Sequence, residues 1–300
     1  MSRFVVLLFF ILLFFIGCGT DERDGRPYFV ATTMMLEDAI SQIGGDLVQV
    51  YGLMGPGVDP HMYRATPRDF QRMEQADMVV YNGLFLEARL SEILSRMDDK
   101  TYAAAEILPE DRLIEAYEFG GNFDPHVWFD VSLWADVVRG LSEQIITKIP
   151  DQEEVLRANT ATYLAELEEL HNWVVEEIAS IPENRRVLIT AHDAFGYFGK
   201  AYNIEVKGLQ GLSTQTEVGL QDVRNMVRFI MANEIPAIFL ETSIAPRSIQ
   251  SIINGVQERG GQVSLGGELF SDAMGERNTP EGTYIGMVRH NVNTITNALK

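Results

Sequence analysis

The sequence contains a single cysteine, Cys18, among its 300 residues. One cysteine cannot form a disulfide within the chain, and it cannot supply a structural zinc site built from several cysteines. Basic residues are also scarce, since 24 Lys and Arg stand against 43 Asp and Glu, giving a formal net charge of -19. Nucleic acids and anionic membrane surfaces both require clustered Lys and Arg. We therefore expect no nucleic-acid partner.

Several motifs of common hydrolases are missing as well. The chain has no HExxH zinc-protease motif, no GxSxG nucleophile turn and no cysteine placed as a nucleophile. Low-complexity tracts are absent, and 46% of the residues are hydrophobic, as in globular proteins. A chain of this length exceeds one ordinary domain and suits two of about 120 to 150 residues.

Residues 1–17 form one apolar run that contains a single Arg near its start. The run is shorter than the roughly 20 residues of a transmembrane helix, and it predicts a secretion signal peptide. Cys18 follows Gly17 directly, in a pattern that resembles the lipobox of bacterial lipoproteins, although Phe15 stands where that pattern usually has Leu. We predict acylation of Cys18, with residues 18–27 as a polar tether. An uncleaved anchor and ordinary cleavage are the alternatives.

The stretch from Asp151 to Ile181 contains neither Gly nor Pro and is bracketed by Pro150 and Pro182. Its apolar residues recur at intervals of three and four, which predicts one long amphipathic helix. Asp151, with Glu154 three residues later, resembles a capping box at the start of this helix. The predicted buried stripe consists of Val155, Leu164, Leu167, Leu170, Val174, Ile178 and Ile181.

Strand-like and helix-like segments alternate on both sides of this helix, a pattern that indicates parallel sheets. We predict four strands before it, over residues 28–33, 48–54, 78–83 and 101–106, and four after it, over 186–190, 205–209, 237–242 and 262–267. The predicted fold is α/β, with two (β/α)4-type lobes (28–149 and 183–300) joined by one spanning helix (150–182). A ligand site is expected between the lobes.

Three of the five histidines, His61, His126 and His192, follow predicted strands. Ligands of open parallel sheets bind beyond the carboxyl ends of the strands. The tripeptide Asp-Pro-His occurs twice, ending at His61 and at His126. Imidazole is the commonest neutral metal ligand, and its second ring nitrogen needs an acceptor. Asp59, Asp124 and Asp193 either provide such acceptors or simply cap turns. We assign His171 and His290 to helix packing or to the surface.

A fourth ligand is expected in the last strand-end loop of the second lobe. Asp272 occupies the matching place, although Glu268, Glu276 and Glu281 lie in the same loop. Three imidazoles and one carboxylate suit Zn²⁺ and tolerate Mn²⁺ or Fe²⁺, whereas Ca²⁺ needs an oxygen cage and Cu⁺ needs sulfur.

These motifs resemble those of the TroA-like group, the zinc/manganese substrate-binding lipoproteins of bacterial ABC importers. The resemblance covers residues 28–300, in GLMGPGVDPHMYRATPRD, FDPHVWFD, RVLITAHDAFGYFGKAY and GGELFSDAMG. It implies two lobes on one long helix, with one Zn²⁺ or Mn²⁺ held by His61, His126, His192 and Asp272. The His-rich loop of many zinc-specific members is absent from residues 109–123. Manganese-specific members typically have Glu at the position of His192, so the chain resembles the His3Asp members, which handle zinc and manganese.

The resemblance further implies an exported receptor, in the periplasm or at the cell surface, that delivers the metal to an ABC permease with its ATPase. We expect a monomer without enzymatic activity, attached to the membrane through the lipid on Cys18. Two alternatives remain: a mononuclear zinc hydrolase, which would need an open water position beside a general base, and a metal-binding surface adhesin.

Overall fold

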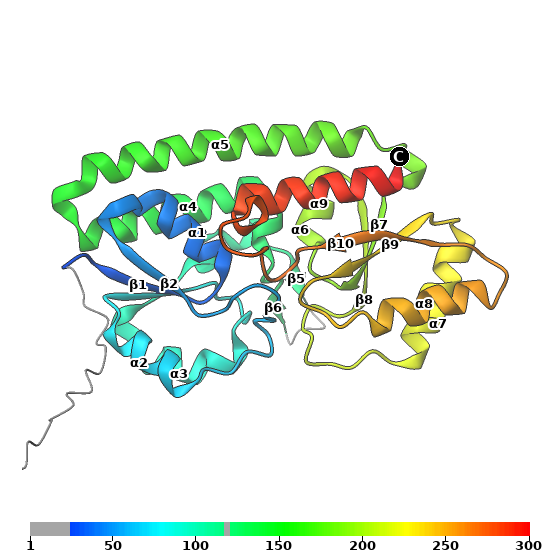
Figure 1. Ribbon diagram of the computed structural model, residues 1–300, viewed down its shortest axis with the longest axis horizontal. Helices are drawn as coiled ribbons and strands as arrows, with labels where there is room; N and C mark the ends of the chain where they lie inside the picture. Colours follow the sequence, from blue (N-terminus) through cyan, green and yellow to red (C-terminus); the bar gives the residue numbers. More distant parts are fainter. Residues whose placement is uncertain (1–24, 117–120) are drawn as a thin grey trace, which may run out of the picture.

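The computed structural model describes residues 25–116 and 121–300. Its elements form two α/β lobes side by side, with helix α5 (Glu153–Ala179) running along both (Figure 1). The predicted fold class is therefore confirmed. The apolar run 1–17 and Cys18 lie outside the described residues. No described helix is both long enough and apolar enough to cross a membrane.

The first lobe contains a four-stranded parallel sheet in the order β2-β1-β3-β4. Its strands are β1 (Tyr28–Ala31), β2 (Gln49–Gly52), β3 (Met78–Tyr81) and β4 (Thr101–Ala103). Chain order reverses between β1 and β3, and ligands of open parallel sheets bind at such a reversal. The main helices of this lobe are α1 (Met34–Gly44), α2 (Pro67–Gln75), α3 (Ser91–Ser95) and α4 (Val131–Lys148).

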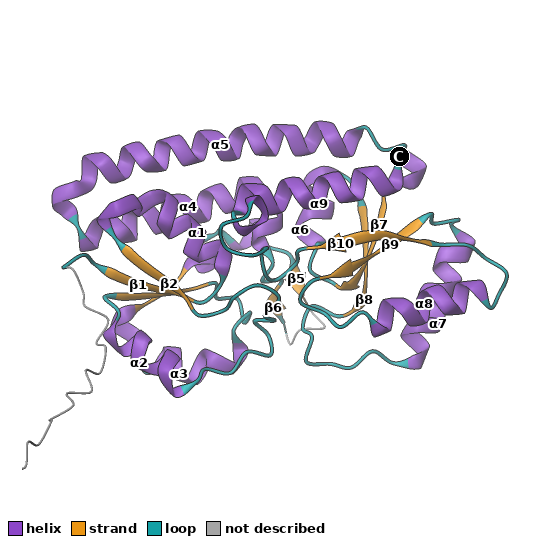
Figure 2. Cartoon of the chain, in the orientation of Figure 1, coloured by secondary structure: helices purple, strands orange, loops and turns teal. Residues whose placement is uncertain are grey.

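The second lobe contains the four predicted strands as two parallel pairs, β7 with β8 and β9 with β10, and β7 lies against β9 (Figure 2). These strands are β7 (Val187–His192), β8 (Glu205–Gln210), β9 (Ala237–Glu241) and β10 (Ser264–Leu269). The helices are α6 (Gly196–Tyr202), α7 (Leu220–Ala232), α8 (Arg247–Gln257) and α9 (Tyr284–Leu299).

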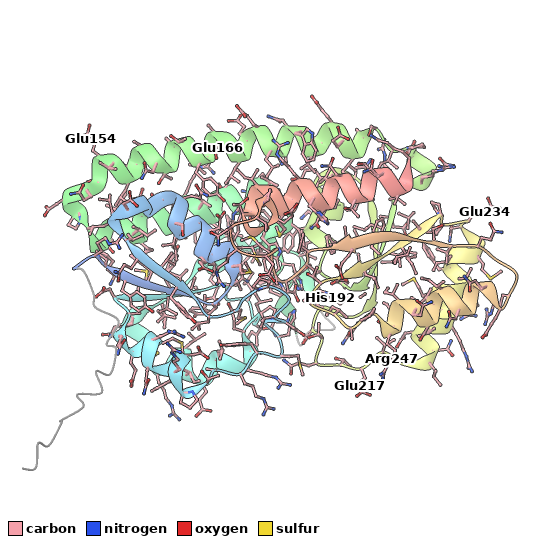
Figure 3. The ribbon with its side chains drawn as sticks, in the orientation of Figure 1. Glu154, Glu166, His192, Glu217, Glu234 and Arg247 are labelled. Atoms are coloured by element: carbon pink, nitrogen blue, oxygen red, sulfur yellow. The ribbon has the colours of Figure 1, made fainter. Side chains whose placement is uncertain are left out.

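Helix α5 has 27 residues, about 40 Å at 1.5 Å per residue, and it contacts α1, α4, α6 and α9. Its outer side carries Glu154 and Glu166 (Figure 3). Two details of the prediction are wrong. The chain makes a short 3-10 turn over Pro150–Gln152, so Asp151 does not cap α5. Val155 is exposed, and Leu156 takes its place in the buried stripe, which also contains Thr160 and Tyr163.

Residues 85–97 are helical only over 88–95. Leu84 and Phe85 have positive φ angles, and regular helix is limited to Ala88–Leu90 and α3. The cause is Glu87, whose buried carboxylate accepts hydrogen bonds from the Asn82 and Gly83 backbone N–H groups and so fixes a turn. The loop 108–123 contains a short antiparallel pair that was not predicted, β5 (Glu115–Ala116) with β6 (Asn122–Phe123).

One hydrophobic core runs through both lobes on the side covered by α5. Trp128 of the first lobe and Tyr284 of the second both belong to it, and the Tyr284 hydroxyl donates a hydrogen bond to the Trp128 carbonyl at 2.6 Å. The Trp128 indole in turn donates to the Ser271 carbonyl at 3.1 Å. On this side, separating the lobes would expose apolar surface and leave buried polar groups unpaired.

Candidate metal centre

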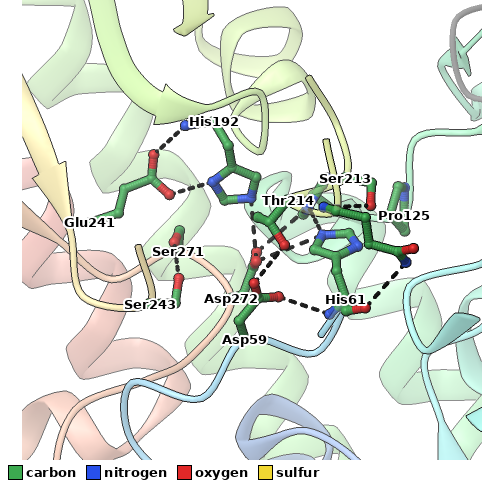
Figure 4. A network of polar contacts seen from close by, with 12 residues as sticks. Asp59, His61, Pro125, His192, Ser213, Thr214, Glu241, Ser243, Ser271 and Asp272 are labelled. Atoms are coloured by element: carbon green, nitrogen blue, oxygen red, sulfur yellow. Dashed lines mark hydrogen bonds and ion pairs between the residues drawn. The ribbon is translucent and has the colours of Figure 1, made fainter. Parts of the chain in front are cut away.

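The four predicted ligands, His61, His126, His192 and Asp272, meet in one place. His61 lies in the loop after β2 and His126 follows β6, whereas His192 is the last residue of β7 and Asp272 follows β10. Each lobe thus contributes two side chains, and the rings of His61 and His192 point toward Asp272 (Figure 4). His192 lies deep between the lobes (Figure 3).

The distances between the ligand atoms match a tetrahedral metal site. Nε2 of His61 is 3.3 Å from Nε2 of His126, and Nε2 of His192 is 3.3 Å from Oδ2 of Asp272. Oδ1 of Asp272 is 3.5 Å from Nε2 of His126, and Oδ2 of Asp272 is 3.7 Å from Nε2 of His61. Metal-to-ligand distances of about 2.0–2.1 Å give a tetrahedron with edges of about 3.3–3.4 Å. All the ligand atoms lie within 4.8 Å of one another, so the cluster is compact enough to hold a Zn²⁺-sized ion.

All four side chains are withdrawn from solvent: the three histidines are 0% exposed and Asp272 is 2% exposed. Neither carboxylate oxygen of Asp272 accepts a hydrogen bond from any described residue. A buried carboxylate without hydrogen bonds is costly unless a cation balances it. The donor set, three borderline nitrogens and one oxygen, matches that of divalent transition-metal sites.

Carboxylates fix the rings of two of the histidines. Nδ1 of His126 lies 2.7 Å from Oδ1 of Asp124. Asp124 is therefore an acceptor for the imidazole ring, which is one of the two roles that the sequence predicted for it. Nδ1 of His192 lies 2.5 Å from Oε2 of Glu241, at the end of β9. Such contacts fix the tautomer that leaves Nε2 free for a metal. Sequence reasoning considered Asp193 for this role and missed Glu241. The available signal was an acidic residue closing the apolar strand AIFLE.

Asp59 does not contact the His61 ring. Its Oδ1 accepts a hydrogen bond from the His61 backbone N–H at 2.8 Å, which is the turn-capping alternative. Nδ1 of His61 is buried and has no hydrogen-bond partner among the described residues. The backbone, rather than the ring, therefore fixes the position of His61.

Burial and neighbouring charges shift the protonation of the cluster. Burial lowers the pKa of His61 to about 3, so its imidazole is neutral near pH 7. Burial also opposes the charged form of His192, but the carboxylates of Glu241 and Asp272 outweigh it and raise the pKa of His192 well above its ordinary value. Burial alone would raise the pKa of Asp272, yet the adjacent imidazoles, His192 foremost, bring it well below its usual range.

The remaining candidates lie elsewhere. His171 in α5 contacts the Tyr202 hydroxyl at 3.2 Å, and His290 in α9 contacts the Glu268 carbonyl at 3.0 Å, in agreement with the predicted packing and surface roles. In the described part of the chain, the cluster includes Asp272 and excludes Glu268, Glu276 and Glu281. Four protein ligands would make a closed site, of the kind that holds a structural or transported metal, whereas catalytic zinc sites keep one position for water.

Comparison with known proteins agrees with this geometry. Residues 29–298 match the model of the family described as ZnuA, zinc-uptake complex component A periplasmic. The chain is 46% identical to the manganese-binding lipoprotein MntA of Bacillus subtilis over 290 residues, which cover 95% of this chain and 94% of MntA. It is 44% identical to the zinc-binding protein TroA of Treponema pallidum over 285 residues, covering 94% and 92% of the two chains. The solved structure of that periplasmic zinc-binding TroA superimposes with a TM-score of 0.90 over 92% of this chain and 99% of TroA.

Proposed function

We propose that this chain, which belongs to the ZnuA family of periplasmic zinc-uptake components, is a receptor that binds one Zn²⁺ or Mn²⁺ ion and delivers it to an ABC permease. The observation that carries the proposal is the buried cluster of three imidazoles around an Asp272 carboxylate that no described residue hydrogen-bonds. His61, His126, His192 and Asp272 would be the ligands. MntA and TroA, named for manganese and zinc respectively, support these two metals as the ligand.

The closed ligand set favours capture over catalysis. Zinc hydrolases use three protein ligands and keep a fourth position for the attacking water. Here Asp272 takes the fourth position, and every ligand is buried. The family consists of substrate-binding receptors, and we infer that this chain has no enzymatic activity.

We further infer an exported receptor, in the periplasm or at the cell surface, that is attached through a lipid on Cys18 and acts as a monomer beside its permease and ATPase. The lipoprotein name of MntA supports the anchor. For the organisation of the chain we propose a signal peptide (1–17), a tether (18–27), two lobes (28–149 and 183–300) and a linker helix (150–182).

Metal titration of the protein without residues 1–17 tests the proposal. We expect one tightly bound Zn²⁺ per chain and loss of tight binding in His126→Ala, because an incomplete ligand set competes poorly with water. His290→Ala is the matched control, since it removes a histidine that lies outside the cluster and should leave binding unchanged. Stoichiometric tight zinc in His126→Ala would refute the ligand assignment.

Thermal unfolding provides a second readout. A ligand that binds only the native state stabilises it by about 4 kcal/mol when its free concentration exceeds Kd a thousandfold. The melting temperature should therefore rise with zinc in the unmodified protein and in His290→Ala, and it should stay constant in His126→Ala. A chain that melts at the same temperature with and without zinc would contradict a native-state site.

A further inference from the structure

The three histidines of the cluster are held in two different ways. Glu241 and Asp124 hold the rings of His192 and His126 through Nδ1, and each of these carboxylates also accepts the backbone N–H of its histidine. His61 has no such contact at Nδ1 among the described residues. Its position depends on what binds its backbone, and part of that support comes from the opposite lobe.

Two side chains of the second lobe reach across to the His61 loop. The Thr214 hydroxyl donates a hydrogen bond to Oδ2 of Asp59 at 2.5 Å, and the Gln215 side-chain amide donates to the His61 carbonyl at 3.2 Å. Because Oδ1 of Asp59 accepts the His61 N–H, the Asp59 carboxylate connects Thr214 to the backbone of the ligand (Figure 4). We call residues 213–216 the clasp.

The clasp is a surface segment with a defined internal structure. The Gln210 side-chain amide donates to the Thr214 and Thr216 carbonyls, and the Ser213 hydroxyl accepts the Gln215 backbone N–H. A cavity of about 440 Å³ adjoins the clasp and is lined by Thr214, Val218, Leu220, Ile244 and Arg247, among others.

The contacts between the lobes differ in how easily they break. Those made by Trp128 and Tyr284 lie in the core that both lobes share, under α5. The clasp contacts are only partly buried, and Gln215 is exposed. An ion enclosed by four buried ligands needs one ligand to withdraw before it leaves. Of the three histidines, His61 has the least support, because no carboxylate holds its ring at Nδ1.

We propose, on the basis of the metal-receptor function above, that Thr214 and Gln215 are positioning residues for His61 and that His61 is the first of the three histidines to leave the metal. Opening of the clasp precedes release of the ion. The clasp therefore sets the dissociation rate.

Stopped-flow transfer of Zn²⁺ from the protein to a fluorescent chelator measures the dissociation rate. We expect Thr214→Val to raise it about tenfold, because the lost hydrogen bond ends on a carboxylate, and Gln215→Ala to raise it a few-fold. Thr216→Val is the matched control, since the structure gives a hydrogen bond only to its carbonyl, and it should release zinc at the unmodified rate. Thr214→Ser keeps the hydroxyl and should restore the slow rate.

A double-mutant cycle with His61→Ala, run at zinc concentrations high enough to load this weaker site, tests the order of release. Once His61 is absent, Thr214→Val should change the dissociation rate less than twofold. A tenfold effect that persists without His61 would overturn the assignment of His61 as the first histidine to leave. Equal release rates in the unmodified protein, Thr214→Val and Gln215→Ala would overturn the clasp itself. Both outcomes presuppose one bound zinc per chain, whereas absence of bound zinc from the unmodified protein would refute the receptor function instead.

Discussion

Glu241 binds His192 through both of its carboxylate oxygens: Oε2 lies 2.5 Å from Nδ1 of the ring, and Oε1 accepts the backbone N–H of the same residue at 2.8 Å. The two residues come from neighbouring strands, β7 and β9, and both are buried. Ring and backbone of His192 are thereby fixed together, and Nε2 is directed toward Asp272. The imidazole of His192 is therefore preorganised for metal binding.

Glu241→Gln should weaken zinc binding by about 10–100-fold, the range typical for residues that orient metal ligands. The amide keeps the size of the side chain but loses the charge that polarises the imidazole. Competition titration against a chelator of known affinity measures the change. Glu258→Gln, an exposed acid on the same lobe, serves as the control. Equal affinities in both variants would show that Glu241 does not tune His192.

Metal binding should release about one proton near pH 7. The carboxylates of Glu241 and Asp272 raise the pKa of His192 against the effect of burial, so the metal-free site keeps a proton on this histidine that the metal must displace. Burial lowers the pKa of His61 to about 3, so His61 contributes no proton there. Below the pKa of His192, affinity should fall about tenfold for each unit of falling pH.

Calorimetric titration in buffers with different ionisation enthalpies measures this proton. The apparent binding enthalpy should vary linearly with buffer ionisation enthalpy, with a slope near one proton per metal. The Glu241→Gln variant should release a smaller fraction, because one of the two charges that raise the pKa of His192 is gone. An enthalpy independent of the buffer would contradict the prediction.

His192→Glu should weaken zinc more than manganese. Imidazole supplies a nitrogen ligand of borderline softness. A site of three imidazole nitrogens and one carboxylate oxygen prefers Zn²⁺ to Mn²⁺, in line with the Irving–Williams order. A carboxylate adds a hard oxygen that Mn²⁺ accepts more readily, so the ratio of the two dissociation constants should narrow without inverting. Competition titrations with both metals measure that ratio. An unchanged or wider ratio would mean that ligand type at residue 192 does not set selectivity.

The position of Glu241 adds a further expectation for the same variant. A carboxylate at residue 192 would lie beside the carboxylate of Glu241, and like charges in a buried site repel. Addition of Glu241→Gln to His192→Glu should therefore recover part of the manganese affinity. No recovery in the double variant would show that the two side chains do not interact.

The lobes should move little when metal binds. Helix α5 contacts helices of both lobes, and a common core lies beneath it, so large rotations would break buried contacts. Small-angle scattering curves of the metal-free and zinc-loaded protein should nearly superimpose. A change in radius of gyration of several ångströms would instead indicate a large hinge.

The sequence predicted the main elements because local patterns determine them. The four strands of each lobe and helix α5 lie where apolar runs, turns and helical periodicity placed them. Where the prediction fails, a residue distant in the sequence determines the local structure. The turn at Asn82 and Gly83 depends on the buried Glu87, whose carboxylate also accepts a hydrogen bond from Thr32, directly after β1. No short-range sequence pattern predicts such a contact.

For the metal centre, too, some features follow from the sequence and others only from the tertiary structure. The sequence alone determined which side chains are candidate ligands, since the Asp-Pro-His tripeptides, His192 and Asp272 lie at or beyond the ends of strands. Only the tertiary structure decided what supports each ligand. Glu241 is 49 residues from His192, and Thr214 is 155 residues from Asp59. Hydrogen bonds act over about 3 Å in space regardless of separation along the chain, so the partners of the ligands become visible only in the folded structure.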